Sequence, residues 1–359
     1  AKGAAFAVTR ACQWNLIVHT HGEEELLTMK QVLDTVSETV PCRALVLHES
    51  DASTFSGVIG DDGAAMHASV EANFRDSPSG RREIVAEEIT IETPQLHSRR
   101  LPSLVRSLLL PDVPTTVFVH NPALDADWLR PLCADADRLI FDSGRLRSGG
   151  ELGQLAQVLP ELWPGHEMQV ELMDLGWLRL WPWRLLLSSL YDTPQSRAGL
   201  AQLREIEIGH TAGFMAQALL VAGWLLGRLG LVQTGTLESD GSVGLLPGAG
   251  SSVQCPVRLR LRQCEVACRA TGISHVTLRQ ADYELSAQND ACGGGIELRS
   301  PFQPARTQPL RGRPDAELVI AALGVGGRDP LMYEALQLGA SLLLGDAMLR
   351  AEKQLEVRW

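Results

Sequence analysis

The sequence predicts an α/β N-terminal domain, a mostly parallel sheet with flanking helices, followed by an α+β C-terminal domain. In the first half, short apolar runs alternate with helical stretches, which is typical of parallel strands buried on both faces. In the second half, segments with a period of two and a long apolar helix replace that pattern. A length of 359 residues fits about two domains, and we place them at 1–165 and 166–359.

The expected strands of the first domain are apolar runs with little alternation. They lie at 15–20, 44–50, 84–93, 115–120 and 138–143, with a further apolar stretch at 101–110. Helices are expected over 23–38, near 125–136, and in a last helix that contains Leu155 and Leu159. Pro160, Pro164 and Gly165 then mark the end of the domain.

The second domain begins with a tryptophan-rich segment, residues 174–194. Proline suits the first position of a helix, so we expect a helix from Pro182 to about 192–194, with Trp177 and Trp181 on an extended lead-in. A long apolar helix over 211–229 and a glycine-rich loop over 231–256 follow. Antiparallel strands are expected at 257–263 and 274–280, and helices capped by aspartate at 315–323 and 329–344.

Charge and composition exclude several classes of protein. The chain has 32 Lys+Arg and 43 Asp+Glu, a net charge of −11, so we expect no binding to nucleic acid or to anionic lipid. The longest uncharged apolar run, 211–227, is shorter than the ~20 residues that cross a bilayer, so no membrane partner is expected. Seven cysteines without a C-x-x-C pair, and no apolar stretch of signal-peptide length in the first residues, indicate a cytoplasmic protein.

The common cofactor motifs are missing from the sequence. None of the lysines follows a glycine-rich turn, which excludes a P-loop. The first expected strand runs into His21 and Gly22 and then into three glutamates, Glu23 to Glu25, whose charge would repel a dinucleotide pyrophosphate. No G-x-S-x-G, H-E-x-x-H or EF-hand pattern occurs either. The common nucleophile and metal signatures are therefore missing, no catalytic residue is indicated by a motif, and we expect no cofactor.

Histidines gather where the expected strands end. His19, His21, His48 and His120 fall at carboxyl ends of strands, and Asp142 ends another. Ligands bind at this edge of open parallel sheets, and His19 and His21 share one strand face, a possible metal-ligand geometry. The alternative is that polar residues collect wherever a strand reaches solvent. We favour that alternative and expect these histidines to hold no metal.

Two segments are candidates for binding a partner. The strand at 257–263 places Arg258, Arg260 and Arg262 on one face, either as a docking stripe for an acidic partner or as the solvated face of a half-buried sheet. We favour the solvated face, in which case reversing these charges should leave folding nearly unchanged.

The other segment, 174–194, carries three tryptophans within seven residues. Core packing at the domain junction accounts for at least two of the rings. The sharper hypothesis is an aromatic hot spot for a partner, with Arg179 and Arg184 beside the rings.

The same segment resembles the glucose-6-phosphate dehydrogenase assembly proteins, the OpcA family. The pattern is Asp-Leu-x-Trp-x-Arg-Leu-x-Pro-Trp-Arg, carried by Asp174, Leu175, Trp177, Arg179, Leu180, Pro182, Trp183 and Arg184. Further matching pieces lie in family order at 15–20, 101–122, 136–143, 222–230 and 328–336. The resemblance thus extends over nearly the whole chain.

The resemblance implies a non-catalytic cytoplasmic protein that binds glucose-6-phosphate dehydrogenase, promotes its active oligomer and raises NADPH supply from the oxidative pentose phosphate pathway. The alternatives are a metal- or sugar-phosphate-dependent α/β enzyme that uses the strand-end histidines, and a sensor whose α/β domain binds a metabolite. The candidate partner-binding residues are Asp174, Trp177, Arg179, Trp181, Trp183, Arg184, Arg258, Arg260 and Arg262.

Overall fold

The chain folds into two compact units, each made of three stretches of sequence. A computed structural model describes residues 9–10, 12–50, 55, 57–59, 65–76, 82–94, 101–120, 126–162, 170–265, 272–290, 294–324, 326–327 and 329–344. The first unit comprises Ala1–Asp142, Val158–Met173 and Pro314–Arg328, and the second comprises Ser143–Gln157, Asp174–Arg313 and Asp329–Trp359. A single boundary at 165 differs from this division. The segment Ser143–Gln157 packs with the second unit, and Pro314–Arg328 packs with the first.

The first unit is built on a mostly parallel sheet, as predicted. In the described part of the chain this sheet has nine strands in the order β4-β5-β6-β3-β2-β7-β8-β9, with β1 paired to β6. Strands β6, β3, β2, β7 and β8 are parallel neighbours, while β4 and β5 form an antiparallel edge. The strands are β1 (Thr9–Arg10), β2 (Trp14–His21), β3 (Cys42–Glu49), β4 (Val58–Ile59), β5 (Ala65–Asp76), β6 (Arg82–Thr93), β7 (Thr115–Val119), β8 (Arg138–Phe141) and β9 (Glu171–Asp174).

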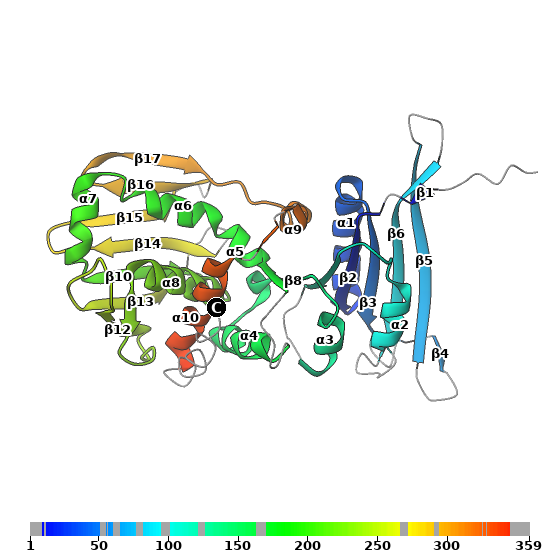
Figure 1. Cartoon of the computed structure of the whole chain (residues 1–359). Coiled ribbons are helices and arrows are strands. Elements are labelled where there is room, and N and C mark those ends of the chain that lie inside the picture. Colours follow the sequence, from blue (N-terminus) through cyan, green and yellow to red (C-terminus); the bar gives the residue numbers. More distant parts are fainter. Residues whose placement is uncertain are drawn as a thin grey trace, which may run out of the picture. The chain divides into compact units, whose positions relative to one another are not determined.

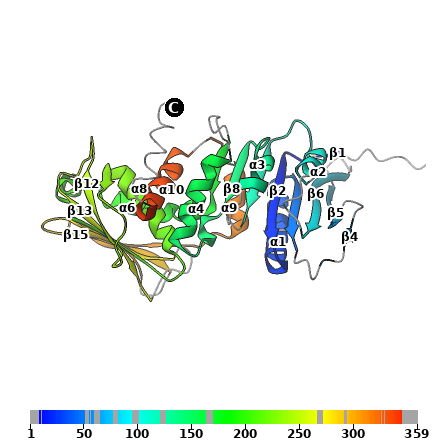
Figure 2. The same cartoon turned by 90° about the horizontal axis from the view of Figure 1, so that it is seen from below.

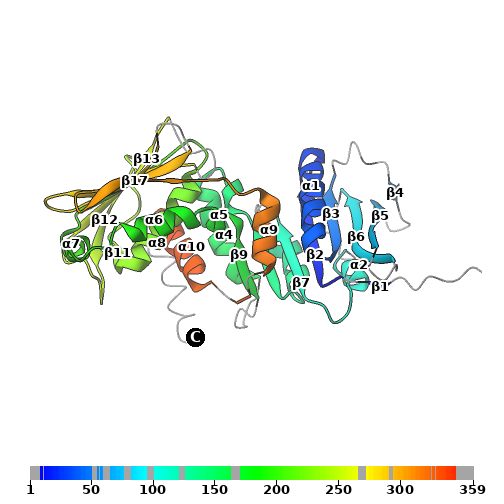
Figure 3. The ribbon, with the colours of Figure 1, turned by 90° about the horizontal axis from the view of Figure 1, so that it is seen from above.

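Helices cover both faces of this sheet, which explains its apolar strands. Helices α1 (Glu23–Thr39) and α9 (Asp315–Gly324) lie on one face, and α2 (Leu101–Leu108) and α3 (Ala126–Cys133) lie on the other (Figure 2). Helix α9 runs beside α1 although nearly the whole chain separates them in sequence (Figure 3). The interior strands β2, β3 and β7 are buried along almost their full length.

The order of the strands defines a switch point between β2 and β7. From β2 the chain turns to β3 on one side, and it returns later to β7 on the other side. Loops diverge at such a point, so the carboxyl ends of β2 and β7 border the position where open α/β sheets bind ligands. Gly22, with φ of 74°, makes the turn from β2 into α1. Residues at these two strand ends are therefore candidates for a ligand-binding site.

The second unit has a curved, largely antiparallel sheet (Figure 1). Its strand order is β11-β12-β13-β10-β14-β15-β16-β17, and only β10 and β13 pair in parallel among the described strands. The strands are β10 (Glu205–His210), β11 (Leu231–Gln233), β12 (Ser242–Pro247), β13 (Val257–Gln263), β14 (Ile273–Arg279), β15 (Glu284–Asn289), β16 (Gly295–Ser300) and β17 (Gln303–Pro309).

The region 231–256 is not the single loop that its glycines predicted. It contains the antiparallel pair β11 and β12, in which Leu231 lies opposite Pro247. Val243 and Leu245 of β12 point into the core. Glycine is depleted in strands, and here it obscures a short alternation of buried and exposed residues. The expectation of one loop was therefore wrong.

Helices cover one face of the second sheet (Figure 2). They include α6 (Trp181–Ser189), α8 (Met215–Leu229) and α10 (Pro330–Leu344). The second unit also contains α5 (Leu175–Arg179), α7 (Pro194–Gly199) and most of α4 (Gly149–Glu161). The backbones of α8 and α10 touch, because a Cβ on Gly223 would lie 2.0 Å from the carbonyl oxygen of Ala335. Among the described residues, no helix has both the length and the apolar character needed to cross a bilayer.

Candidate functional site

The Trp segment, residues 174–194, folds into consecutive helices α5 and α6. Asp174 caps α5: its carboxylate accepts hydrogen bonds from the backbone N–H of Gly176 (2.9 Å) and of Trp177 (3.2 Å). Helix α6 then begins at Trp181, one residue before Pro182. The predicted extended lead-in was therefore wrong, because an aspartate N-cap begins a helix ahead of the proline.

Asp174 holds α5 against the turn at 143–145. Its carboxylate also accepts hydrogen bonds from the backbone N–H (2.9 Å) and hydroxyl (2.6 Å) of Ser143. Gly176 permits this approach, since a Cβ there would lie 2.1 Å from the Ser143 hydroxyl oxygen and 2.7 Å from the backbone nitrogen of Gly144. Asp174 is 1% exposed. Its place in the site is to position the helix.

Trp177 is clamped between a cation and a carboxylate. The Arg184 guanidinium stacks 3.4 Å from the ring centroid and donates to the Trp177 carbonyl oxygen at 3.1 Å. The indole N–H donates to Asp329 at 2.7 Å, and Asp329 in turn caps α10 through the N–H groups of Leu331 and Met332. Burial lowers the pKa of Arg184 to about 10, against the opposing charges of Asp329 and Asp174. Arg184 therefore remains a cation at neutral pH.

Two apolar side chains of α6 face solvent above this clamp. The Trp181 side chain is 57% exposed and Leu185, one turn further on, is 54% exposed. The Trp181 ring also lies over the Arg184 guanidinium, at 5.4 Å. Trp183, in contrast, is fully buried, and Arg179 is half-buried. Of the tryptophans in the Trp segment, Trp181 is therefore the one that a partner can reach.

Arg260 and Arg262 of β13 belong to a ladder of ion pairs across the second sheet, while Arg258 on the same face is exposed. Glu205 and Glu207 on the neighbouring strand β10 lie 3.5 Å from Arg260 and 4.0 Å from Arg262, respectively. Arg279 of β14 continues the ladder at 3.1 Å from both glutamates. Reversing the charges at Arg260 and Arg262 would place like charges side by side, so the expectation that folding would be nearly unchanged does not fit this arrangement.

The partners that give these residues their roles lie outside the segments that the sequence singled out. The alternation EIEIGH at 205–210 matches that of VRLRLRQ at 257–263 and is the signal that could have paired the two strands. Burial acts to raise the pKa of Glu207, but hydrogen bonds from His275 and Arg279 outweigh it and lower the pKa. Leu185 carried no local signal, because its exposure depends on how α6 packs.

Three of the strand-end histidines lie in separate surroundings and do not contact one another through hydrogen bonds among the described residues. His21 is exposed and pairs with Glu49 at 3.1 Å, and buried His48 hydrogen-bonds the Thr20 hydroxyl at 3.1 Å. His19 is buried against Trp128, with ring centroids 4.7 Å apart, and neither ring nitrogen has a hydrogen-bond partner among the described residues. Burial lowers its pKa to about 4, against the charges of Glu25 and Glu49, so His19 is neutral at neutral pH.

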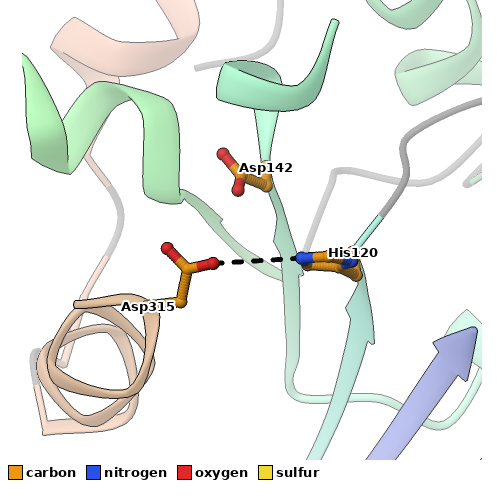
Figure 4. Close-up of side chains that lie close together, drawn as sticks. All are labelled: His120, Asp142 and Asp315. Atoms are coloured by element: carbon orange, nitrogen blue, oxygen red, sulfur yellow. Dashed lines mark ion pairs between the residues drawn. The ribbon is translucent and has the colours of Figure 1, made fainter. Parts of the chain in front are cut away.

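The fourth histidine, His120, lies among carboxylates (Figure 4). Its Nδ1 is 2.7 Å from Glu25, in the first turn of α1. One potential ligand atom from each of His120, Asp142 and Asp315 lies within 4.8 Å of the others. The structure thus adds Glu25 and Asp315 to the edge that the sequence assigned to His120 and Asp142.

Comparison with known proteins identifies related sequences for both halves of the chain. Residues 33–157 match the glucose-6-phosphate dehydrogenase subunit N-terminal domain, and residues 170–336 match the corresponding C-terminal domain. A protein named OxPP cycle protein OpcA from Synechocystis is 27% identical over 55% of this chain. Its namesake from Nostoc punctiforme is 26% identical, again over 55% of this chain. The matches span 39% and 40% of those two proteins, about two fifths of their length.

Solved structures support the fold alone. An NAD-binding oxidoreductase from Klebsiella pneumoniae superposes with a TM-score of 0.50 and 11% identity, covering 94% of this chain and 97% of that one. Such low identity carries no information on activity. The two family domains, in contrast, follow one another along most of the sequence and include the Trp segment. The chain therefore belongs to the OpcA family of glucose-6-phosphate dehydrogenase assembly proteins.

Proposed function

We propose that this chain is a non-catalytic assembly factor and allosteric activator of glucose-6-phosphate dehydrogenase, which binds the dehydrogenase oligomer and so supports NADPH production. Family membership supports the choice of partner. The single observation that carries a binding role is the exposure of Trp181, which lies within the family-specific segment at one of the unspecified positions of its pattern. We assign the contact surface to Trp181 and Leu185 of α6, with Arg179 beside them.

The surroundings of Trp181 favour recognition of a protein partner. Exposed tryptophan is a frequent hot-spot residue, because a rigid ring buries much apolar area at a small entropic cost. Trp181 stacks on Arg184, which is itself held by Trp177. Asp174 and Asp329 fix the helices on which this stack depends. A ring ordered before binding loses less freedom in the complex.

The remaining candidates fit less well as docking residues. Asp174, Trp177 and Trp183 are buried, so we assign them to holding the surface in place. Arg260 and Arg262 are paired with glutamates of β10, and a partner would have to compete with these contacts. We therefore treat the β13 arginines as the solvated face of the sheet.

The carboxyl edge of the first sheet disfavours the enzymatic alternative. Glu25 occupies the first turn of α1 at the switch point, where it accepts a hydrogen bond from the backbone N–H of His21 (2.9 Å) and contacts His120. A dinucleotide phosphate at this helix end would meet carboxylates and no glycine-rich loop. The separately engaged His19, His21 and His48 do not converge on one reacting position.

Activation requires that the chain distinguish two states of the dehydrogenase. A factor shifts an equilibrium only by its difference in affinity for the two states. Coupling free energies of about 1–3 kcal/mol already change the populations several-fold. The factor must therefore bind the active oligomer more tightly than the inactive form.

The test is turnover and oligomer size of the cognate dehydrogenase with and without this chain. We expect the chain to raise kcat/KM or to stabilise the oligomer, and Trp181→Ala to weaken this effect while remaining folded. Leu246→Ala is the matched control, since Leu246 is a 48% exposed apolar residue elsewhere in the second unit. Unchanged turnover and size at micromolar concentrations would overturn the proposal. Oxidation of glucose 6-phosphate by the chain alone would support the enzymatic alternative.

A further inference from the structure

Three distant parts of the chain place possible metal ligands at one point of the first unit (Figure 4). His120 follows β7, Asp142 follows β8, and Asp315 is the first residue of α9. Their ligand atoms lie within 4.8 Å of one another. His120 is 4% exposed and Asp142 is fully buried, whereas the Asp315 side chain is 23% exposed, so the cluster lies at the margin of the core.

One ring nitrogen of His120 is available to bind a ligand. Its Nδ1 is 2.7 Å from the Glu25 carboxylate and therefore donates a hydrogen, so Nε2 carries the lone pair in the neutral imidazole. The buried Nε2 has no hydrogen-bond partner in the described structure. It faces Asp315 at 4.0 Å, which is too long for a hydrogen bond. Ligand atoms about 2 Å from one tetrahedral ion lie about 3.3 Å apart, so a small rotation of the partly exposed Asp315 side chain would bring the pair to ligand distance.

We propose that His120, Asp142 and Asp315 bind a divalent transition-metal cation of the Zn²⁺ or Mn²⁺ type. Imidazole nitrogen suits Zn²⁺ and related ions, and carboxylate oxygen suits both Zn²⁺ and Mn²⁺. Glu25 provides the carboxylate that commonly orients a metal-bound histidine through its other ring nitrogen. The sequence alone led us to expect no metal, because polar residues collect wherever strands reach solvent. The contribution of Asp315 comes from a part of the chain far from His120, which no local pattern records.

The cation would fasten the N-terminal end of α9 to the first sheet. The C-terminal end of this helix is already held, because buried Arg138 of β8 donates hydrogen bonds to the carbonyl oxygens of Ala322 (2.5 Å) and Leu323 (2.8 Å). Asp315, at the other end, approaches β7 and β8 through the cluster. Metal binding therefore couples residues 120, 142 and 315 and stabilises the folded unit.

The test is a calorimetric titration of the chelator-treated full chain with Zn²⁺, Mn²⁺ and Mg²⁺. We expect about one equivalent of Zn²⁺ or Mn²⁺ to bind and raise the Tm, and Mg²⁺, which prefers oxygen ligands, to bind more weakly. Glu25→Gln should weaken binding by about 10- to 100-fold, as loss of an orienting carboxylate commonly does. His120→Gln and Asp315→Asn should abolish both the binding and the rise in Tm.

His21→Gln is the matched control, because His21 forms an exposed histidine–glutamate pair at the same edge. It should bind metal like the wild type. If His120→Gln fails to fold, Asp315→Asn keeps the test decisive, since the Asp315 side chain is 23% exposed and nearly isosteric with asparagine. Absence of Zn²⁺ and Mn²⁺ binding to the folded wild type would overturn the proposal, as would unchanged binding in Asp315→Asn.

Discussion

The two sheets treat their polar side chains in opposite ways. The first sheet buries them at its carboxyl edge, where both ring nitrogens of His19 and one of His120 have no hydrogen-bond partner in the described structure. The second sheet spreads them over an open face, where Glu205 and Glu207 pair with arginines of both neighbouring strands. The paired charges are explained by the sheet itself. The buried Nε2 of His120 beside two carboxylates is not, and it is therefore the stronger sign of a ligand.

The same contrast recurs within the Trp segment. Trp177 and Trp181 are four residues apart, yet the first is 2% exposed and the second is 57% exposed. Buried Trp177 has a partner for its indole N–H and a cation on its face. Exposed Trp181 keeps much of its apolar surface in water. Trp181, whose apolar surface remains exposed, is therefore more informative about function than Trp177.

Replacing Trp177 or Trp181 by alanine should produce the largest difference in the free energy of unfolding between two variants. We expect Trp177→Ala to lower the free energy of unfolding by ~3–5 kcal/mol, because it removes a buried ring and leaves Arg184 without its stacking partner. Trp181→Ala should stay within ~0.5 kcal/mol, as exposed substitutions usually do. Urea denaturation of both variants measures this. Equal losses of stability would contradict the division of the Trp segment into a buried and a binding part.

Acid should destabilise the first unit through His19. Its pKa is 6.5 in the unfolded chain and about 4 in the folded one. Between these values the unfolded chain binds a proton that the folded chain does not, so stability falls as the pH falls from 6.5 to 4. The free energy of unfolding should fall by about 3 kcal/mol, because each pKa unit between the folded and the unfolded chain corresponds to about 1.36 kcal/mol.

Denaturation at a series of pH values should show this loss in the wild type and in His21→Gln, the exposed control. His19→Phe cannot bind the proton and should lose that part of the pH dependence. The prediction fails if His19→Phe and the wild type have the same slope between pH 6.5 and 4.

Charge reversal on the second sheet should have a smaller effect. The double variant Arg260→Glu, Arg262→Glu places new glutamates beside Glu205 and Glu207, and we expect a cost of ~1–2 kcal/mol, since each exposed pair contributes up to ~1 kcal/mol. The neutral double variant Arg260→Gln, Arg262→Gln removes the ion pairs without adding repulsion, so it should cost less stability than the charge reversal. Thermal unfolding of both double variants tests this. A double variant as stable as the wild type would show that the ladder contributes nothing.

Salt should produce the smallest change, and only on the open face. The difference in stability between the wild type and Arg279→Gln should shrink from low salt to ~1 M NaCl, where charges are screened beyond ~3 Å. We expect this change to stay below ~1 kcal/mol. The pH dependence assigned to His19 should persist in the same salt, because the imidazole is buried away from ions. Equal sensitivity of both effects to salt would remove the contrast between the two sheets.

Local sequence was sufficient for the regular elements whose pattern agrees with their surroundings. The apolar runs at 15–20 and 115–120 predicted strands β2 and β7, since strands under helices on both faces need apolar residues throughout. The period of two at 257–263 predicted β13 and the exposed side of its arginines. Aspartates at 315 and 329 marked the starts of α9 and α10 to within one residue. Several strands were not predicted, among them β5, β11 and β12, because alanine, glycine and polar residues weaken the strand pattern.

Composition and motif also determined the family, since the Asp-Leu-x-Trp-x-Arg-Leu-x-Pro-Trp-Arg pattern is a property of the chain alone. Which tryptophan is buried and which is exposed was decided by packing, because Asp174 begins α5 early and thereby turns Trp177 inward. The ion-pair ladder depends on β10 and β13 becoming neighbours, although about fifty residues separate them. The carboxylates around His120 come together only when α1 and α9 settle on the same face of the first sheet. Such contacts join residues distant in sequence, and no local periodicity records them.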